Sequence, residues 1–238
     1  MRADIFKSRG VFSLVFLIIL VIDIIVKNTL DVSFYRFISK ISLPVLLISF
    51  YIINQKEAFE IKKYFMITAL SFFLIGDIFF ILYEVELYYI LGIIFFSLGK
   101  VFYVFKFSNQ KEFKLGKLLP VVFFCFTLMF IMLYLINDNL NNYFFPTLVY
   151  LFTVTMFVIF AFLRRGLVNN RSFYLVLIGV FLSLFADSIA ALSSFYSNAA
   201  IPYQESTVML FYGVSQLFIV LGVLKETACN KRKKVIIN

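Results

Sequence analysis

The stretch YFMITALSFFLIGDIFFILY, at residues 64–83, decides the fold class of this chain. It is apolar along most of its length and carries one charge, Asp77. A helix rises ~1.5 Å per residue, so a stretch of this length crosses about 30 Å, the hydrocarbon thickness of a bilayer. Similar runs recur along all 238 residues and leave no room for a sizeable soluble domain. The sequence therefore predicts an integral membrane protein.

Composition supports the same class of protein. Hydrophobic residues make up 63% of the chain and charged residues only 15%, against roughly 25% charged in an average soluble domain. We expect an all-α fold in which residues 1–238 form one transmembrane domain of eight helices, with a basic cytoplasmic tail at 225–238. The predicted helices cover residues 11–26, 37–53, 64–83, 87–107, 118–136, 144–163, 173–196 and 206–224.

Basic residues place both ends of the chain on one side of the membrane. Most of the 22 Lys and Arg residues, Lys106 and Arg164 among them, fall in segments that share one side of an eight-helix path. By the positive-inside rule we expect both termini to be cytoplasmic, in the cytoplasmic membrane or its equivalent. Topology and anionic lipid headgroups also account for the net charge of +9, so no nucleic-acid partner is expected. The basic segments are the N-terminus and residues 54–63, 106–117, 164–171 and 225–238.

The residue types that are missing narrow the possible chemistry. The chain has no histidine, which excludes His-based metal sites, Ser-His-Asp triads and imidazole proton shuttles. Its two cysteines, Cys125 and Cys229, lack metal-ligand spacing, and the sequence contains no glycine-rich phosphate loop. We therefore expect neither a metal nor a cofactor, and any chemistry must come from Asp, Glu, Lys, Tyr, Ser, Thr and Gln.

Two aspartates lie inside apolar runs, Asp77 in SFFLIGDIFFILY (71–83) and Asp187 in GVFLSLFADSIAAL (179–192). An ionisable group at membrane depth costs several kcal/mol unless it is paired or hydrated, so its presence indicates a functional site. Two such groups in matching settings predict paired-carboxylate chemistry, with Asp77 and Asp187 as the catalytic residues. The alternative is a structural role, in which each carboxylate bonds neighbouring helices across the bundle.

A weak internal repeat relates the two aspartates. LPVLLISFY (43–51) resembles FPTLVYLFT (145–153), and each segment is followed by a helix with an intramembrane aspartate. Two four-helix halves, 11–107 and 118–224, would make the third helix of each half a counterpart across a pseudo-twofold axis along the membrane normal. That arrangement predicts that the two carboxylates come together. Chance similarity between segments rich in Phe, Leu, Ile and Val is the alternative.

Helical spacing indicates which side chains share the faces of the aspartates. Gly179, Ser183 and Asp187 recur at i, i+4 and i+8, a small and polar stripe suited to close packing or to a cavity. Both aspartates fall in the outer half of the membrane, which predicts a cavity that opens outward or laterally. For Asp23 and Lys40, an interfacial ion pair or snorkelling is favoured over catalysis. The candidate supporting residues are Lys40, Lys100, Tyr103, Tyr150, Tyr212 and Gln216.

Several segments follow one another in a distinctive order. They are SKISLP (39–44), GDIFF (76–80), GIIFFSLGKVFYVFKF (92–107), the helix that begins near Pro146 and carries Tyr150, GVFLSLFADSIAAL (179–192) and VMLFYGVSQLFIVLG (208–222). Together they resemble the YhhN family of eight-helix membrane proteins, which includes the lysoplasmalogenases. The resemblance runs from about the second predicted helix to the eighth. One position departs from the family pattern, since Lys100 stands where the family commonly has a histidine.

The resemblance implies hydrolysis of the vinyl ether bond of a lysoplasmalogen, or of a related ether lysolipid, to a fatty aldehyde and a glycerophospho-alcohol. Two carboxylates suit this reaction: a neutral one protonates the β-carbon, and an ionised one stabilises the oxocarbenium ion and activates water. Lys100 either keeps one aspartate ionised as its counter-ion or binds the lipid phosphate. The three tyrosines and Gln216 either form interhelical hydrogen bonds or position water and the glycerol oxygens.

Two other classes of function fit the same residues. A proton- or cation-coupled transporter also uses intramembrane Asp and Lys residues, and parallel repeats suit it. Against a transporter, the helices after Pro44 show little of the paired Gly and Pro interruption that marks unwound transport sites. A non-catalytic membrane scaffold is the third class, and it leaves the matched aspartates unexplained.

Overall fold

The computed structural model describes residues 8–29, 34–57, 59–108, 115–196 and 203–226, and its long elements are all α-helices. Eight of these helices are long and apolar enough to cross a membrane. The predicted all-α fold with eight membrane-spanning helices is therefore confirmed. The helices are α2 (Arg9–Thr29), α3 (Phe34–Asn54), α4 (Glu60–Ile81), α5 (Glu86–Phe107), α6 (Leu115–Ile136), α7 (Phe144–Leu163), α8 (Asn170–Phe195) and α9 (Gln204–Leu224).

Most helices extend beyond the apolar runs that predicted them. Helix α4 begins at Glu60 and α8 at Asn170, each several residues earlier than expected. The apolar run marks the part that meets hydrocarbon, whereas the backbone hydrogen bonds of a helix continue through polar residues at the membrane surface. Pro44 and Pro120 lie inside α3 and α6 and end neither helix.

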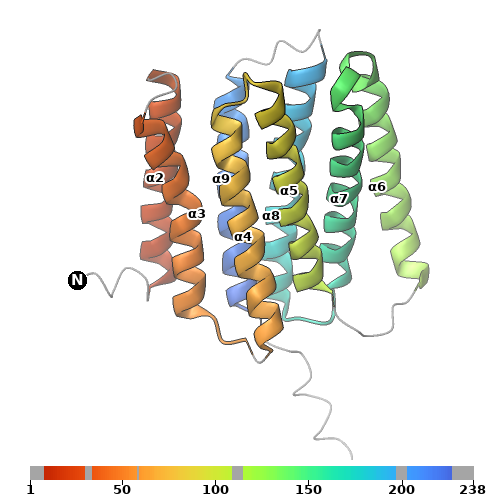
Figure 1. Cartoon of the computed structure of the whole chain (residues 1–238). Coiled ribbons are helices and arrows are strands. Elements are labelled where there is room, and N and C mark those ends of the chain that lie inside the picture. The colour runs from red at the N-terminus through yellow and green to blue at the C-terminus, as the bar shows by residue number, and fades with distance from the viewer. Residues whose placement is uncertain (1–7, 30–33, 58, 109–114, 197–202, 227–238) are drawn as a thin grey trace, which may run out of the picture.

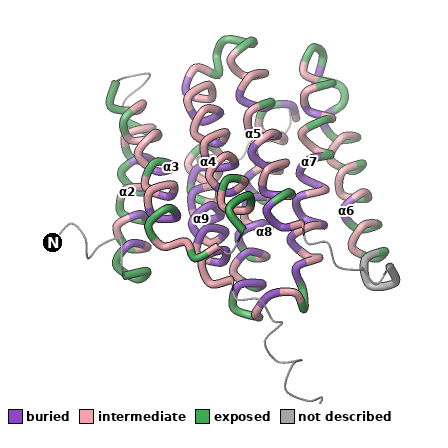
Figure 2. The backbone as a smooth tube through the Cα atoms, turned by 60° about the horizontal axis from the view of Figure 1, so that its bottom comes forward, coloured by how far each residue is buried: buried purple, intermediate pink, exposed green. Residues whose placement is uncertain are grey.

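The helices stand side by side in one bundle, with α2 and α3 at one end and α6 at the other (Figure 1). Helix α4 packs along α5 and α8 along α9, while α5 also packs on α7. The helices at the two ends of the bundle are the least buried. These are α2 and α6, whereas α5, α7 and α9 are the most buried (Figure 2). Arg9 donates a hydrogen bond to the carbonyl of Leu224 at 3.3 Å, so α2 begins where α9 ends. We call this side of the bundle the terminal side.

Glycines allow α8 and α9 to approach closely. A Cβ on Gly179 would lie 2.9 Å from the carbonyl oxygen of Ser215, and one on Gly222 would lie 2.9 Å from the backbone nitrogen of Val176. Backbone atoms at that distance cannot move aside for a methyl group, so only glycine fits at these two positions. The stripe of small and polar residues on α8 was predicted to serve either close packing or a cavity. At its Gly179 end it serves close packing.

Candidate active site

Asp77 lies near the end of α4 that faces away from the terminal side, and two neighbouring helices supply its partners. The ammonium of Lys40, on α3, is 3.5 Å from Oδ1 of Asp77. The hydroxyl of Tyr212, on α9, donates a hydrogen bond of 3.1 Å to Oδ2. Lys40 also lies 5.6 Å from the centre of the Tyr212 ring, where the face of an aromatic ring attracts a cation. We call these three residues the Asp77 cluster.

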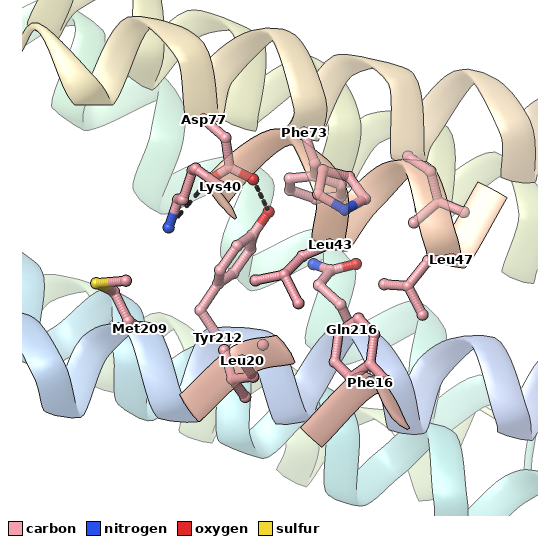
Figure 3. A pocket seen from close by; sticks show the side chains of 13 residues that line it. Phe16, Leu20, Lys40, Leu43, Leu47, Phe73, Asp77, Met209, Tyr212 and Gln216 are labelled. Carbon is pink, nitrogen blue, oxygen red and sulfur yellow. Dashed lines mark hydrogen bonds and ion pairs between the residues drawn. The ribbon is translucent and has the colours of Figure 1, made fainter. Parts of the chain in front are cut away.

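The Asp77 cluster forms one end of a cavity between α2, α3, α4 and α9 (Figure 3). Apolar side chains form most of the wall, and Lys40, Asp77, Tyr212 and Gln216 are its polar members. The volume open to the centre of a water molecule is about 20 Å³, which is room for one ordered water. The cavity therefore holds a carboxylate, a cation, a phenol and space for water within apolar surroundings. The remaining lining residues are Phe16, Leu20, Leu43, Pro44, Leu47, Leu70, Phe73, Met209 and Gly213.

Asp187, on α8, has a second set of partners. Lys100, on α5, contacts its Oδ2 directly and also donates to Ser183 Oγ at 3.2 Å. The hydroxyl of Tyr150, on α7, donates to Oδ1 at 2.6 Å, and the Tyr150 ring lies 4.9 Å from the Lys100 ammonium. Lys100 is 1% exposed and Asp187 is largely covered. Of the two predicted roles for Lys100, the structure shows the counter-ion. We call Lys100, Tyr150, Ser183 and Asp187 the Asp187 cluster.

The two clusters are neighbours, but the structure shows no direct bond between their carboxylates. Within the described ranges, Asp77 bonds to Lys40 and Tyr212, while Asp187 bonds to Lys100, Tyr150 and Ser183. Packed aromatic rings provide the indirect link. Phe73 contacts both Tyr212 and Tyr103, and Tyr103 stacks on Phe157, whose ring lies 5.6 Å from the Lys100 ammonium. Each carboxylate is thus served by its own lysine and its own tyrosine.

Tyr103 and Gln216 form an interhelical hydrogen bond beside the cavity. The Tyr103 hydroxyl, on α5, donates to Oε1 of Gln216, on α9, at 2.6 Å. Tyr103 stacks on Phe157, whose ring also lies 5.6 Å from the Lys100 ammonium. Gln216 faces the cavity whereas Tyr103 stands behind it. Of the two predicted uses of these residues, the structure shows the interhelical bond, which holds the Gln216 amide in place.

Lys40 and Asp23 differ from the expectation of an interfacial ion pair. Lys40 pairs with Asp77 instead, because α3 turns its lysine toward α4. Asp23 is fully buried on α2, where its Oδ1 accepts a hydrogen bond of 2.7 Å from Ser39. Its Oδ2 is buried and has no hydrogen-bond partner among the residues that the structure describes.

A buried ion network at the terminal side was missed by sequence reasoning, which placed Lys106 and Arg164 in basic loops. Lys106 lies in the last turn of α5 and contacts Glu57 directly and Glu226 at 3.6 Å. Arg164 lies 3.3 Å from Glu226 and donates to Ser172 at 3.0 Å. Burial lowers the pKa of the Arg164 guanidinium, and the neighbouring carboxylates oppose this shift. The spacing of residues within one segment cannot predict such a network, because its members come from five separate parts of the chain.

The part of the chain that the structure describes contains no set of side chains suited to bind a metal ion. No group of three or more His, Cys, Asp or Glu side chains there is arranged to hold a metal ion. The polar groups around the two aspartates are lysines and phenols, which compete poorly as metal ligands and serve as proton or hydrogen-bond donors.

The fold and the two clusters define a multi-pass membrane protein that buries lysine–aspartate–tyrosine clusters between its helices. A family model described as the YhhN family matches residues 35–223, so the chain belongs to the YhhN family, as its motifs had indicated. The match covers both clusters and Gln216, whereas Asp23 lies outside it. Comparison with curated proteins found no match, and neither did comparison with solved structures.

Proposed function

We propose that this protein is a membrane-embedded hydrolase that cleaves the vinyl ether of a lysoplasmalogen, or of a related ether lysolipid. One observation carries the proposal: Asp77 lies at the polar end of a mostly apolar cavity that has room for a water molecule. An ether lysolipid likewise has a polar part and an apolar part, since its ether oxygen lies between a polar headgroup and a hydrocarbon chain. Membership of the YhhN family supports this substrate class.

The reaction needs one proton donor, one water and a site that tolerates a transient cation. A neutral carboxylic acid protonates the β-carbon of the vinyl ether and leaves an oxocarbenium ion beside the new carboxylate. Water then adds to the cation and gives its proton to the carboxylate. The resulting hemiacetal collapses to a fatty aldehyde and the free hydroxyl of the glycerol. No oxidant, reductant or cofactor enters this balance.

We assign the proton donor to Asp77. Asp187 contacts Lys100 directly and accepts hydrogen bonds from the hydroxyls of Tyr150 and Ser183, and a carboxylate with this many donors is a poor source of protons. The ion pair of Asp77 with Lys40 is looser, at 3.5 Å, and faces the cavity. If Lys40 turns to the phosphate of a bound lipid, Asp77 loses its counter-ion in apolar surroundings, where a neutral acid is favoured over an unpaired charge.

Asp187 then supports the reaction from outside the cavity. It accepts the hydrogen bond of the Tyr150 hydroxyl and holds Lys100 by direct contact, so it orients both side chains. Because Lys100 balances the charge of Asp187, the pair acts through this positioning and not through a net charge. Both aspartates therefore contribute, Asp77 by proton transfer and Asp187 by positioning.

We propose that the two clusters are counterparts in two four-helix halves, α2–α5 and α6–α9. In each cluster the aspartate lies on the third helix of one half, with one partner from the second helix of that half and another from the fourth helix of the other half. Lys40 and Tyr150 are then equivalent positions, as are Lys100 and Tyr212. We also place the terminal side in the cytoplasm, because Lys106 and Arg164, which belong to the basic segments, lie at that side.

The test is aldehyde release from lysoplasmenylethanolamine by purified protein in detergent. We expect wild type to release aldehyde, and we expect Asp77→Asn and Asp187→Asn each to abolish turnover while the protein still folds. Asp138→Asn is the matched control, because Asp138 is exposed in a short 3-10 helix between α6 and α7. The two-carboxylate mechanism is wrong if either buried variant keeps near-normal turnover.

A proton- or cation-coupled transporter is the second candidate function. The observation that favours it is the buried Lys100–Asp187 pair, since ion pairs at membrane depth also form proton relays in transporters. Proton or cation flux into liposomes that contain the protein, without any aldehyde from added lipid, would select this alternative. Aldehyde release would eliminate it together with a purely structural scaffold.

A further inference from the structure

Asp23 has a buried carboxylate oxygen that nothing in the described structure satisfies. The residue is fully buried, and its Oδ1 accepts a hydrogen bond from Ser39 while its Oδ2 has no partner among the described residues. A buried carboxylate with one empty acceptor is costly, and natural proteins seldom keep such a group without a use for it. The free oxygen therefore marks a place where a hydrogen-bond donor, and a cation above all, would be stabilised.

The position of Asp23 relates it to the Asp77 cavity. Phe16, Leu20 and Asp23 follow one another at i, i+4 and i+7, so they share one face of α2, and the first two line the cavity. Ser39, which holds Asp23, directly precedes Lys40 in the chain. Asp23 therefore stands beside the polar end of the cavity, one turn beyond Leu20.

We propose that Asp23 binds the primary ammonium of a lysophospholipid headgroup of the ethanolamine type, while Lys40 faces the phosphate of the same headgroup. This inference rests on the proposed function, because it names the headgroup of the substrate in that cavity. The site offers one basic side chain, Lys40, and one acidic side chain, Asp23, which is hydrogen-bonded to Ser39. This pair matches a zwitterionic headgroup whose phosphate and ammonium are two carbons apart.

The same geometry selects a primary ammonium over a trimethylated one. A primary ammonium has three N–H donors and can fill the empty acceptor of Oδ2, whereas a choline headgroup has none. Quaternary ammonium groups are usually bound by cages of aromatic faces, but the Tyr212 face at the polar end of the cavity already lies beside Lys40.

The headgroup can reach Asp23 by separating the outer ends of α2 and α9. Beyond Asp23 these helices are joined by polar contacts, the Lys27–Glu205 ion pair and the hydrogen bonds between Asn28 and Ser206. These contacts are exposed or partly exposed and contribute roughly 0–1 kcal/mol each, so they open at little cost. The buried position of the carboxylate is thus compatible with a ligand that enters from the outer end.

The test measures binding, which does not depend on turnover. The probes are three saturated 1-O-alkyl lysolipids, which lack the vinyl ether: the phosphoethanolamine, the phosphocholine and the phosphate without an amine. Wild type in detergent should bind the phosphoethanolamine about tenfold or more tightly than the phosphocholine, as expected for one hydrogen bond to a charged group. Asp23→Asn should remove this preference and leave the affinity for the amine-free phosphate unchanged.

A charge-matched control separates recognition from general electrostatics. Asp138→Asn, in the exposed 3-10 helix between α6 and α7, removes one negative charge from the same end of the bundle and should keep the headgroup preference. Equal loss of affinity for all three probes in Asp23→Asn, or equal binding of the first two by wild type, would overturn the inference. The wild-type comparison decides the matter even if the variant fails to fold. A retained preference without aldehyde release would refute the hydrolase proposal alone.

Discussion

Removal of Lys100 should destabilise the protein strongly, because this lysine compensates a buried carboxylate. In Lys100→Met the side chain keeps its apolar stem and loses the ammonium, so Asp187 remains with the Tyr150 and Ser183 hydroxyls as donors. Breaking one partner of a buried ion pair costs about 3–5 kcal/mol. Because two donors remain, we expect a loss near the lower end, about 3 kcal/mol in the free energy of unfolding.

Equilibrium unfolding in mixed micelles with increasing SDS, followed by circular dichroism, measures this loss. The double variant Lys100→Met/Asp187→Asn should lose less than the sum of the two single variants, since the second substitution removes the uncompensated charge that the first one leaves. The control is Lys27→Met, which breaks a Lys–Glu contact at the more exposed outer ends of α2 and α9 and should cost about 0–1 kcal/mol. Equal losses for Lys100→Met and Lys27→Met would refute this account of Asp187.

Two further substitutions test packing and hydrogen bonding. Gly179→Ala should lower stability by about 1–3 kcal/mol in the same unfolding assay, because its Cβ would meet α9 backbone atoms, whereas Gly10→Ala should be close to neutral because its Cβ meets open space. Tyr103→Phe removes the donor to Gln216 and should cost about 1 kcal/mol. In the aldehyde assay, Tyr103→Phe should lower turnover less than Asp77→Asn does, since Tyr103 stands behind the cavity wall; an equal loss would contradict this placement.

The fold class follows from local properties of the sequence, and so do the two aspartates as features of interest. An apolar run such as 64–83 specifies a membrane-spanning helix because every backbone polar group must be satisfied inside the segment when no water is present. The same cost of unsatisfied polarity identifies Asp77 and Asp187 as unusual wherever the helices pack. The stripe from Gly179 to Asp187 also follows from helical periodicity alone.

The partners of each charge depend on how the helices pack, and only the tertiary structure decides them. Spacing along α3 did not show that Lys40 turns to Asp77 and not to Asp23, and the composition of the basic segments did not show that Lys106 and Arg164 are buried. Periodicity fixes which residues share a face of one helix, but the rotation of each helix about its axis depends on close contacts such as those at Gly179 and Gly222. The sequence by itself determined that Asp77, Lys100 and Asp187 lie in membrane-spanning helices, because such helices are specified by local apolar runs, and interhelical packing determined which charges meet.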